Sequence, residues 1–247
     1  MTNTDKVLFI PDCHRPYHDK RAWGLMLRAM ADWEPDTVVI LGDFIDGYFI
    51  SRFTKDPTRY SFGDEIDNGN RGLDELDKLG AKRKIYVAGN HDGQRFDEYI
   101  KRVAPELIGL QTLESLLFLK SRGWEYVKYR DHVKLGKVYI THDVGATGRN
   151  SAHKVIDVYQ HSAITGHTHR MIYAVEADGL GEPILSAQFG WLGDIKHIDY
   201  THRILATKAY VLGFGIGRVE RKTGLLFATP VPIVKYRCMV EGVLWAG

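Results

Sequence analysis

The sequence predicts an α/β fold, because short apolar runs typical of strands alternate with segments of helical period over its first two thirds. The run Val38–Leu41 is predicted as a strand buried on both faces, and Gly42 and Asp43 follow it directly. The same order, an apolar run and then polar side chains able to bind metal, recurs four more times. Loops that leave the carboxyl ends of parallel strands meet at one edge of a sheet, so these side chains are expected to converge there.

The first half of the chain shows strand and helix in turn. Val7–Ile10 is an apolar run that Pro11 ends, and residues 21–33 carry apolar side chains at helical spacing. The next predicted elements are a helix over 71–79 and a strand over 84–88. Residues 49–70 have no clean period, so they are predicted as a long loop with one helical turn at most, of the kind that often carries function.

The second half becomes strand-rich. Residues 96–122 are predicted to be mostly helical, with breaks at Pro105 and Gly109, and a last helix is predicted over 151–159. The predicted strands cover 126–129, 133–135, 138–141, 162–165, 172–175, 184–187, 209–219 and 225–234. The strand-rich tail completes the core sheet, pairs with a second copy of the chain, or does both. No repeat or linker divides the sequence, so residues 1–247 are predicted to form one domain.

The composition excludes several classes of protein. With 33 basic and 31 acidic residues the net charge is +2, which lacks the basic excess of a dedicated nucleic-acid binder. The two cysteines, Cys13 and Cys238, are far apart, so a disulfide framework is not expected and a cytoplasmic setting is. The amino terminus lacks the apolar run of a signal peptide. No segment approaches the roughly 20 apolar residues of a membrane span.

Side chains suited to metal binding follow five of the apolar runs: Asp12, His14, Asp43, Asn90, His91, His142, His167 and His169. Carboxylate and imidazole ligands suit Mn, Fe, Zn or Ni ions. The set is larger than the three or four ligands that one tetrahedral zinc takes. It suits two divalent ions that share a bridging carboxylate, as in two-metal phosphoryl chemistry.

These residues lie in blocks that resemble the five signature motifs of the calcineurin-like metallophosphoesterases. The blocks are Asp12-Cys13-His14, Gly42-Asp43-Phe44-Ile45-Asp46, Gly89-Asn90-His91-Asp92, His142 and Gly166-His167-Thr168-His169. They occur in the order found in the family and span about two thirds of the chain. The resemblance implies a four-layered α/β/β/α sandwich with the metals at the sheet edge. Small members of the family, including virus-encoded ones, are similar to this chain in length and motif form.

The resemblance also implies a role for each matching residue. One metal would be held by Asp12, His14, Asp43 and His169, and the other by Asp43, Asn90, His142 and His167, with Asp43 bridging. A hydroxide between the ions would attack phosphorus. His91 would donate a proton to the leaving oxygen or steady its charge, while Asp92 would orient the His91 ring. Asp46 is expected to support its loop rather than bind metal.

The remaining residues bear on the substrate. Gly47 after Asp46 and Asp143 after His142 depart from the pattern of the family's protein phosphatases. The Gly89–Asp92 and Gly166–His169 blocks have the form found in its repair nucleases. Because of their place beside the motifs, Arg15 and Arg95 are predicted to bind substrate. Trp191 is expected to cover the site, to stack on a base, or simply to pack in the core or a loop.

The predicted function is therefore a two-metal phosphoesterase, with manganese as the first expected metal. Phosphodiester hydrolysis on nucleotide or nucleic-acid substrates is preferred, because His91 can protonate a poor alkoxide leaving group. The alternatives are a phosphomonoesterase acting on protein or nucleotides and a non-catalytic scaffold that carries metal. The full set of ligand residues argues against the scaffold. The near-neutral charge argues against a nucleic-acid-binding module with incidental metals.

Overall fold

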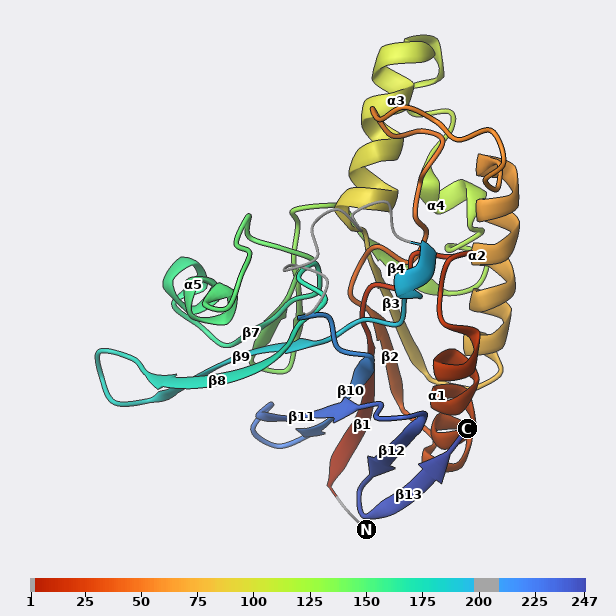
Figure 1. The fold of residues 1–247 in the computed structure, drawn as a ribbon. Coiled ribbons are helices and arrows are strands. Elements are labelled where there is room, and N and C mark those ends of the chain that lie inside the picture. Colours follow the sequence, from red (N-terminus) through yellow and green to blue (C-terminus); the bar gives the residue numbers. More distant parts are fainter. Residues whose placement is uncertain (1–2, 198–208) are drawn as a thin grey trace.

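Two β-sheets lie face to face in the structure, a computed structural model that describes residues 3–197 and 209–247 (Figure 1). The first sheet has the order β11 (Leu226–Pro232), β10 (Gly213–Glu220), β1 (Thr4–Ile10), β2 (Thr37–Ile40), β3 (Arg83–Val87) and β4 (Trp124–Val127). The second has the order β5 (Val133–Leu135), β6 (Val138–Ile140), β7 (Ala163–Ile164), β9 (Pro183–Phe189) and β8 (Met171–Ala177). A separate hairpin joins β12 (Arg237–Val240) and β13 (Val243–Ala246).

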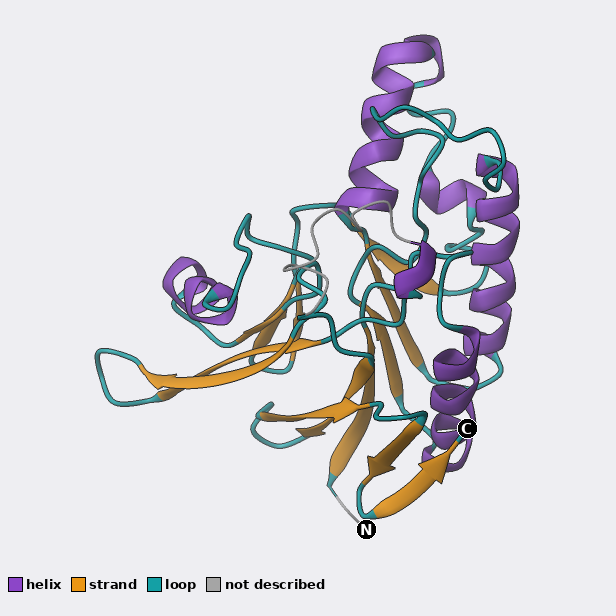
Figure 2. Ribbon diagram, in the orientation of Figure 1, coloured by secondary structure: helices purple, strands orange, loops and turns teal. Residues whose placement is uncertain are grey.

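Helices cover the outer face of each sheet, which gives four layers (Figure 2). The first sheet is covered by α1 (Lys20–Trp33), α2 (Phe62–Asp77), α3 (Arg95–Val103) and α4 (Leu113–Leu116), and the second by α5 (Ser151–Tyr159). Phe9 and Val39 from the first sheet pack against Ile140 and Phe189 from the second. This is the α/β/β/α sandwich that the motifs implied.

The strand directions bring the predicted site together. Strands β1, β2, β3 and β4 run parallel, and so do β6, β7 and β9, so the loops after β1, β2, β3, β6 and β7 leave from carboxyl ends. The tail completes the first sheet, because β10 pairs antiparallel with β1 and β11 pairs with β10. None of the helices in the described residues is long and apolar enough to cross a membrane.

The predicted loop over 49–70 is partly wrong. Helix α2 begins at Phe62, nine residues before the predicted start at 71. Ser61 caps it: its hydroxyl accepts from the Asp64 amide at 3.2 Å, while the Asp64 carboxylate accepts from the Ser61 amide at 2.9 Å. This capping box is a start signal that sequence reading could have used. Residues 50–60 do form the predicted irregular segment.

Candidate metal centre

The loops after the strands hold several predicted ligands in an unusual backbone conformation. The φ angles of His14, Asp43, His167 and His169 are 52°, 48°, 70° and 56°. Few residues other than glycine adopt positive φ, and those that do are concentrated at functional sites. Contacts with the surrounding loops must therefore hold these residues in this unfavourable conformation. The conformation directs their side chains toward one another.

Two glycines let these loops pack closely. A Cβ atom on Gly42 would lie 2.2 Å from Nδ1 of His142, and one on Gly89 would lie 2.1 Å from Oδ1 of Asp43. Backbone bonds tie the same loops together, because the amides of Cys13 and His14 donate to the Asp43 carbonyl at 3.0 and 2.9 Å. A side chain at either glycine would separate the groups that the fold brings together.

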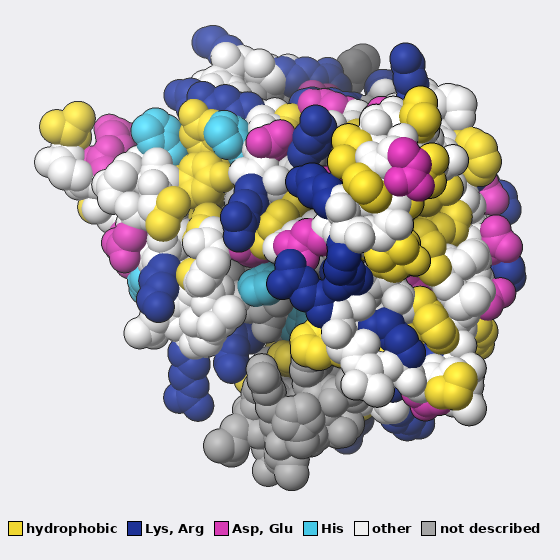
Figure 3. Space-filling model, turned by 90° about the horizontal axis from the view of Figure 1, so that it is seen from above, with side chains coloured by type: hydrophobic (Ala, Val, Ile, Leu, Met, Phe, Trp, Pro, Cys, Tyr) yellow, Lys and Arg dark blue, Asp and Glu magenta, His cyan; other side chains and the backbone are white. Residues whose placement is uncertain are grey.

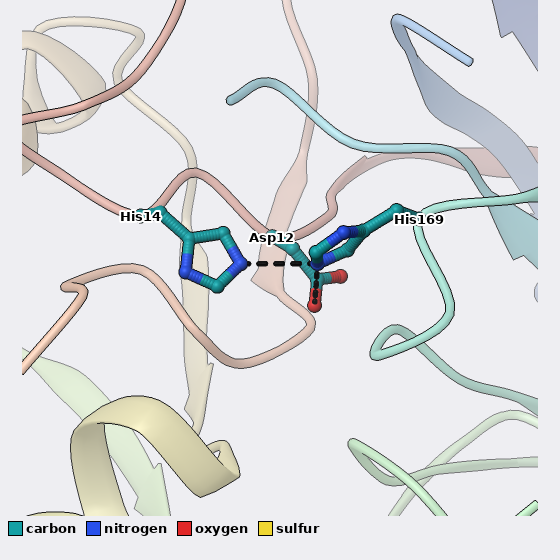
Figure 4. A group of neighbouring side chains, drawn as sticks. All are labelled: Asp12, His14 and His169. Atoms are coloured by element: carbon teal, nitrogen blue, oxygen red, sulfur yellow. Dashed lines mark hydrogen bonds and ion pairs between the residues drawn. The ribbon is translucent and has the colours of Figure 1, made fainter. Parts of the chain in front are cut away.

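Asp12, His14 and His169 form the first group of candidate ligands. Nε2 of His14 lies 3.0 Å from Nε2 of His169, which in turn lies 3.5 Å from Oδ1 of Asp12. The two rings point toward one another beside the carboxylate (Figure 4). One ligand atom of each residue lies within 4.8 Å of the others, and all three side chains are buried. This group joins the loop after β1 to the loop after β7.

Asp43, Asn90, His142 and His167 form the second group. Nε2 of His142 lies 3.3 Å from Oδ2 of Asp43 and 3.0 Å from Oδ1 of Asn90. Nδ1 of His167 lies 2.8 Å from the same Asn90 oxygen. Asp43 also belongs to a cluster with His14, so its carboxylate lies between the two groups. The predicted metal ligands are thus all brought together.

The two aspartates carry buried charge. Asp12 is 0% exposed and Asp43 is 1% exposed. Burial alone would raise the pKa of Asp43, yet the charge of nearby His142 holds that pKa well below its usual value. Burial opposes the charged form of His142 too, but the Asp43 carboxylate raises the pKa of His142 to about 10. Buried carboxylates require a positive partner, and a divalent cation can take the place of the protonated imidazole.

His91 lies beside these groups and is held by Asp46 and Arg95. Nδ1 of His91 donates to Oδ1 of Asp46 at 2.9 Å, and the same oxygen accepts from Nδ1 of His14 at 3.0 Å. Nη2 of Arg95 donates to Nε2 of His91 at 3.2 Å. Burial and then the Arg95 charge lower the pKa of His91 to about 4, so the ring is neutral near pH 7 in this state.

Asp92 does not contact the His91 ring, which differs from the role that the resemblance implied. Its carboxylate instead accepts from the backbone amides of Phe44 at 3.0 Å and Gly89 at 2.6 Å. The orienting contact comes from Asp46. The physical reason is that Asp92 turns into the buried space between the loops after β2 and β3, where backbone donors surround it.

Arg15 also lies away from the group. It is 3% exposed, its Nε donates to the Asn68 carbonyl at 3.1 Å, and its guanidinium lies 4.6 Å from the ring centre of Trp23. Gly72 on α2 makes room for it, since a Cβ there would lie 2.6 Å from Cζ of Arg15. The structure places Arg15 beneath α2, whereas Arg95 lies at the site.

A cavity beside His14 and His169 of the first group is lined by residues that the sequence interpretation missed: Tyr17, Tyr48, Phe53, Arg59 and His197. Trp191 also lines it and stacks on His169, with ring centroids 4.9 Å apart at 19°. A usable signal was present, because aromatic and arginine side chains gather in residues 48–60, directly after the Gly42–Asp46 block. The presence of Tyr17 and His197 in the cavity depends on contacts between segments far apart in the sequence, so no local pattern indicates it.

The family follows from a comparison with known proteins. The family model described as calcineurin-like phosphoesterase matches residues 5–171, more than half of the chain. The chain belongs to this family. It is therefore a hydrolase that acts on phosphoric esters, and the family implies divalent metal ions.

The chain is also similar to known proteins along nearly its whole length. The Gene 54 protein of Mycobacterium phage D29 is 27% identical over 261 residues, which cover 97% of this chain and 98% of that protein. Vacuolar protein sorting 29 from Cryptosporidium parvum is 15% identical with a TM-score of 0.49, covering 98% of this chain and 94% of that one. Yfce, a phosphoesterase from E. coli, is 14% identical with a TM-score of 0.45, covering 91% and 98%.

The donor set of this calcineurin-like phosphoesterase fits divalent metal ions. Nδ1 of His142 donates to the Leu41 carbonyl at 2.7 Å, which leaves Nε2 free to bind a cation. Asp46 fixes His14 in the same way. Cys13 contributes no thiolate, because its buried Sγ donates to the Pro11 carbonyl at 3.3 Å. Oxygen and imidazole donors of this kind suit Mn, Fe, Zn or Ni.

Proposed function

We propose that this chain hydrolyses phosphodiester bonds with two divalent metal ions. Asp12, His14 and His169 would hold one ion, and Asn90, His142 and His167 the other, with Asp43 shared between them. The observation that carries the proposal is the position of Asp43, whose carboxylate lies in one cluster with His14 and in another with His142 and His167. When bound, the two ions would activate water and neutralise charge on the phosphate oxygens.

The protein's own side chains supply the rest of the chemistry. Asp46 holds His91 by Nδ1, so Nε2 faces the cavity beside the metal ligands. The Arg95 guanidinium lies next to that nitrogen and is fixed by its bond to the Asp46 carbonyl at 2.6 Å. A bound phosphate would draw Arg95 away from Nε2, and its negative charge would favour uptake of a proton from water at that nitrogen. His91 would then donate this proton to the oxygen of the leaving alcohol.

The diester preference rests on His91. An alkoxide is a poor leaving group, so a donor beside it accelerates diester cleavage by about a hundredfold to ten-thousandfold. We expect bis-p-nitrophenyl phosphate to be hydrolysed faster than p-nitrophenyl phosphate with Mn²⁺ and not at all with chelator. His91→Ala should lower turnover of the alkyl diester thymidylyl-(3′→5′)-thymidine at least tenfold and affect bis-p-nitrophenyl phosphate less, because p-nitrophenolate leaves without a proton. His161→Ala is the matched control, because His161 is exposed and lies outside the cavity.

The alternatives give different results in the same assay. Metal-dependent turnover of the monoester alone would contradict the diester proposal in favour of a phosphomonoesterase. Two bound metals without turnover of either ester would favour a metal-bearing scaffold. The metal content is therefore measured on the same samples by elemental analysis.

A further inference from the structure

The cavity beside the metal ligands has two chemically different ends. His14, His91, Arg95 and His169 line one end, where the phosphate would lie. The other end is formed by Tyr17, Tyr48, Ser51, Phe53, Arg59, Asp194 and His197, which have no part in holding metal. Trp191, which stacks on His169, lies between the two ends.

The second end, which we term the aromatic pocket, is built around Arg59. Its guanidinium lies 5.2 Å from the ring centre of Tyr17 and 4.9 Å from that of Tyr48. Nη1 of Arg59 donates to the His197 carbonyl at 2.9 Å, which joins the 48–60 segment to the residues after β9. The His197 ring lies 5.9 Å from the ring of Tyr17. Flat, cationic and aromatic groups thus form one wall.

Phe53 stands out within this wall because it is 65% exposed. Aromatic side chains usually bury much of their surface, so an exposed ring at the mouth of a cavity is available to a ligand. On the face seen from above, Lys and Arg side chains gather beside histidines near the middle (Figure 3). Such a surface attracts anionic ligands.

We propose that the aromatic pocket binds the nucleobase of the nucleoside that leaves during hydrolysis. The inference rests on the proposed function, because it places the phosphate at the metal ligands and the leaving group beside His91. Base stacking on aromatic rings and arginine planes is a general mode of nucleotide recognition. Ser51 and Asp194 add polar atoms that can form hydrogen bonds with the edge of a base. A plain phenyl ring has no such edge and would leave these atoms unused.

The stacking that the aromatic pocket requires limits the substrate further. A base in a duplex is paired and stacked, so it cannot lie among these rings without being flipped out. The substrate class is therefore a mononucleotide diester or the unpaired end of a single strand. The 48–60 segment, and Phe53 in particular, sets this specificity without touching the metal ligands.

Binding tests the inference without relying on turnover. The probes are the methylenephosphonate analogues of adenosine 5′-monophosphate and ribose 5-phosphate, which cannot be hydrolysed and differ only in the base. With Mn²⁺-loaded protein, calorimetry should show about tenfold tighter binding of the adenosine compound. Phe53→Ala should abolish that difference and leave binding of the ribose compound unchanged. Phe227→Ala is the matched control, since Phe227 is 63% exposed and lies on β11.

Kinetics then separate this inference from the proposed function. Thymidylyl-(3′→5′)-thymidine is compared with analogues that lack one base or the other. Loss of the leaving-side base should lower kcat/KM about tenfold in the wild type and have no effect in Phe53→Ala. Equal binding of the two phosphonates by the wild type would overturn the inference, even if metal-dependent diester turnover remained. The inference would also be overturned if Phe227→Ala lost the preference for the base to the same extent as Phe53→Ala.

Discussion

The two ends of the cavity are held together by different kinds of contact. We call the end lined by His14, His91, Arg95 and His169 the metal-side wall, and the aromatic pocket forms the opposite wall. The metal-side wall is tied by backbone bonds and by short polar contacts, such as the His91 amide that donates to Oδ1 of Asp43 at 2.7 Å. The aromatic pocket depends on ring and guanidinium contacts around Arg59 and on the Tyr48 hydroxyl, which accepts from the Asp56 amide at 2.7 Å. The first wall also has bonds between backbone groups alone, from the Cys13 and His14 amides to the Asp43 carbonyl, whereas each contact named in the second wall includes a side chain.

This difference indicates how the two functions of the site can change. A substitution in the metal-side wall moves a loop whose backbone positions several ligands at once. A substitution in the aromatic pocket changes a surface while the loops behind it stay in place. We therefore expect the metal-side wall to determine the reaction and the aromatic pocket to determine substrate specificity. This is the usual arrangement when binding residues lie on a loop over a fixed scaffold.

The largest expected effect comes from Gly89→Ala in the metal-side wall. The new Cβ would lie 2.1 Å from Oδ1 of Asp43 and 2.4 Å from its backbone nitrogen, so the carboxylate must move. Displacements of about 1 Å in an active site can cost a hundredfold in rate, and at least that loss of diester turnover is expected. Gly179→Ala is the control, because nothing lies within 4 Å of its added Cβ. Full activity and full metal content in Gly89→Ala would show that the loops are not rigid.

A smaller effect is expected from Asp46→Asn. The substitution keeps the shape of the side chain but removes the charge that orients both His14 and His91. Residues that orient metal ligands typically contribute about tenfold to a hundredfold to affinity or activity. Mn²⁺ affinity by calorimetry and diester turnover should both fall within that range. Asp32→Asn, an exposed site on α1, is the control. If the variant lost turnover but kept its metal affinity, Asp46 would be needed to orient His91 and not to orient the metal ligand His14.

The sequence predicted the residues of the metal-side wall well, because the pattern that marks each of them lies within a short stretch of sequence. Each candidate ligand comes within a few residues of the end of an apolar strand, and parallel strands bring those ends together. The positive φ angles of Asp43 and His169 have no such local mark, because they depend on neighbouring loops. Arg15 was predicted to bind substrate, and its position beneath α2 could not be foreseen for the same reason. Its proximity to Asp12 in sequence did not show that Gly72, far along the chain, leaves space for it beneath α2.

The aromatic pocket could not be predicted from any one segment. Tyr17 comes from the loop after β1, Arg59 from the segment before α2, and His197 from the region after β9. Arg59 brings the three together only in the folded chain. The start of α2 was within reach through its capping box, yet glycine and asparagine residues in the helix weaken its periodic signal.

The smallest expected effect on activity, and a distinct effect on stability, comes from Glu65→Gln on α2, beneath the boundary between the two walls. Glu65 is 0% exposed, Oε1 accepts from the Tyr48 amide at 3.0 Å, and Oε2 is buried with no hydrogen-bond partner in the described residues. Burial, and then the nearby Asp46 charge, raise the pKa of Glu65 to about 8 from the ordinary 4.5. The folded state therefore binds a proton that the unfolded state has lost between these two pH values.

The sign of the pH dependence follows from this difference. Where the folded state holds more protons, the free energy of unfolding falls as pH rises, so the contribution of Glu65 is complete below about pH 4.5 and is lost by about pH 8. Glu65→Gln cannot ionise, and it should be more stable than the wild type by a few kcal/mol at pH 8.5 but close to it at pH 5. Urea unfolding at both pH values, with chelator present, measures the gap, and the exposed Glu182→Gln is the control. A gap that does not change with pH would mean that Glu65 is already ionised in the folded protein, and the loop that carries Asp46 would then rest on a buried charge.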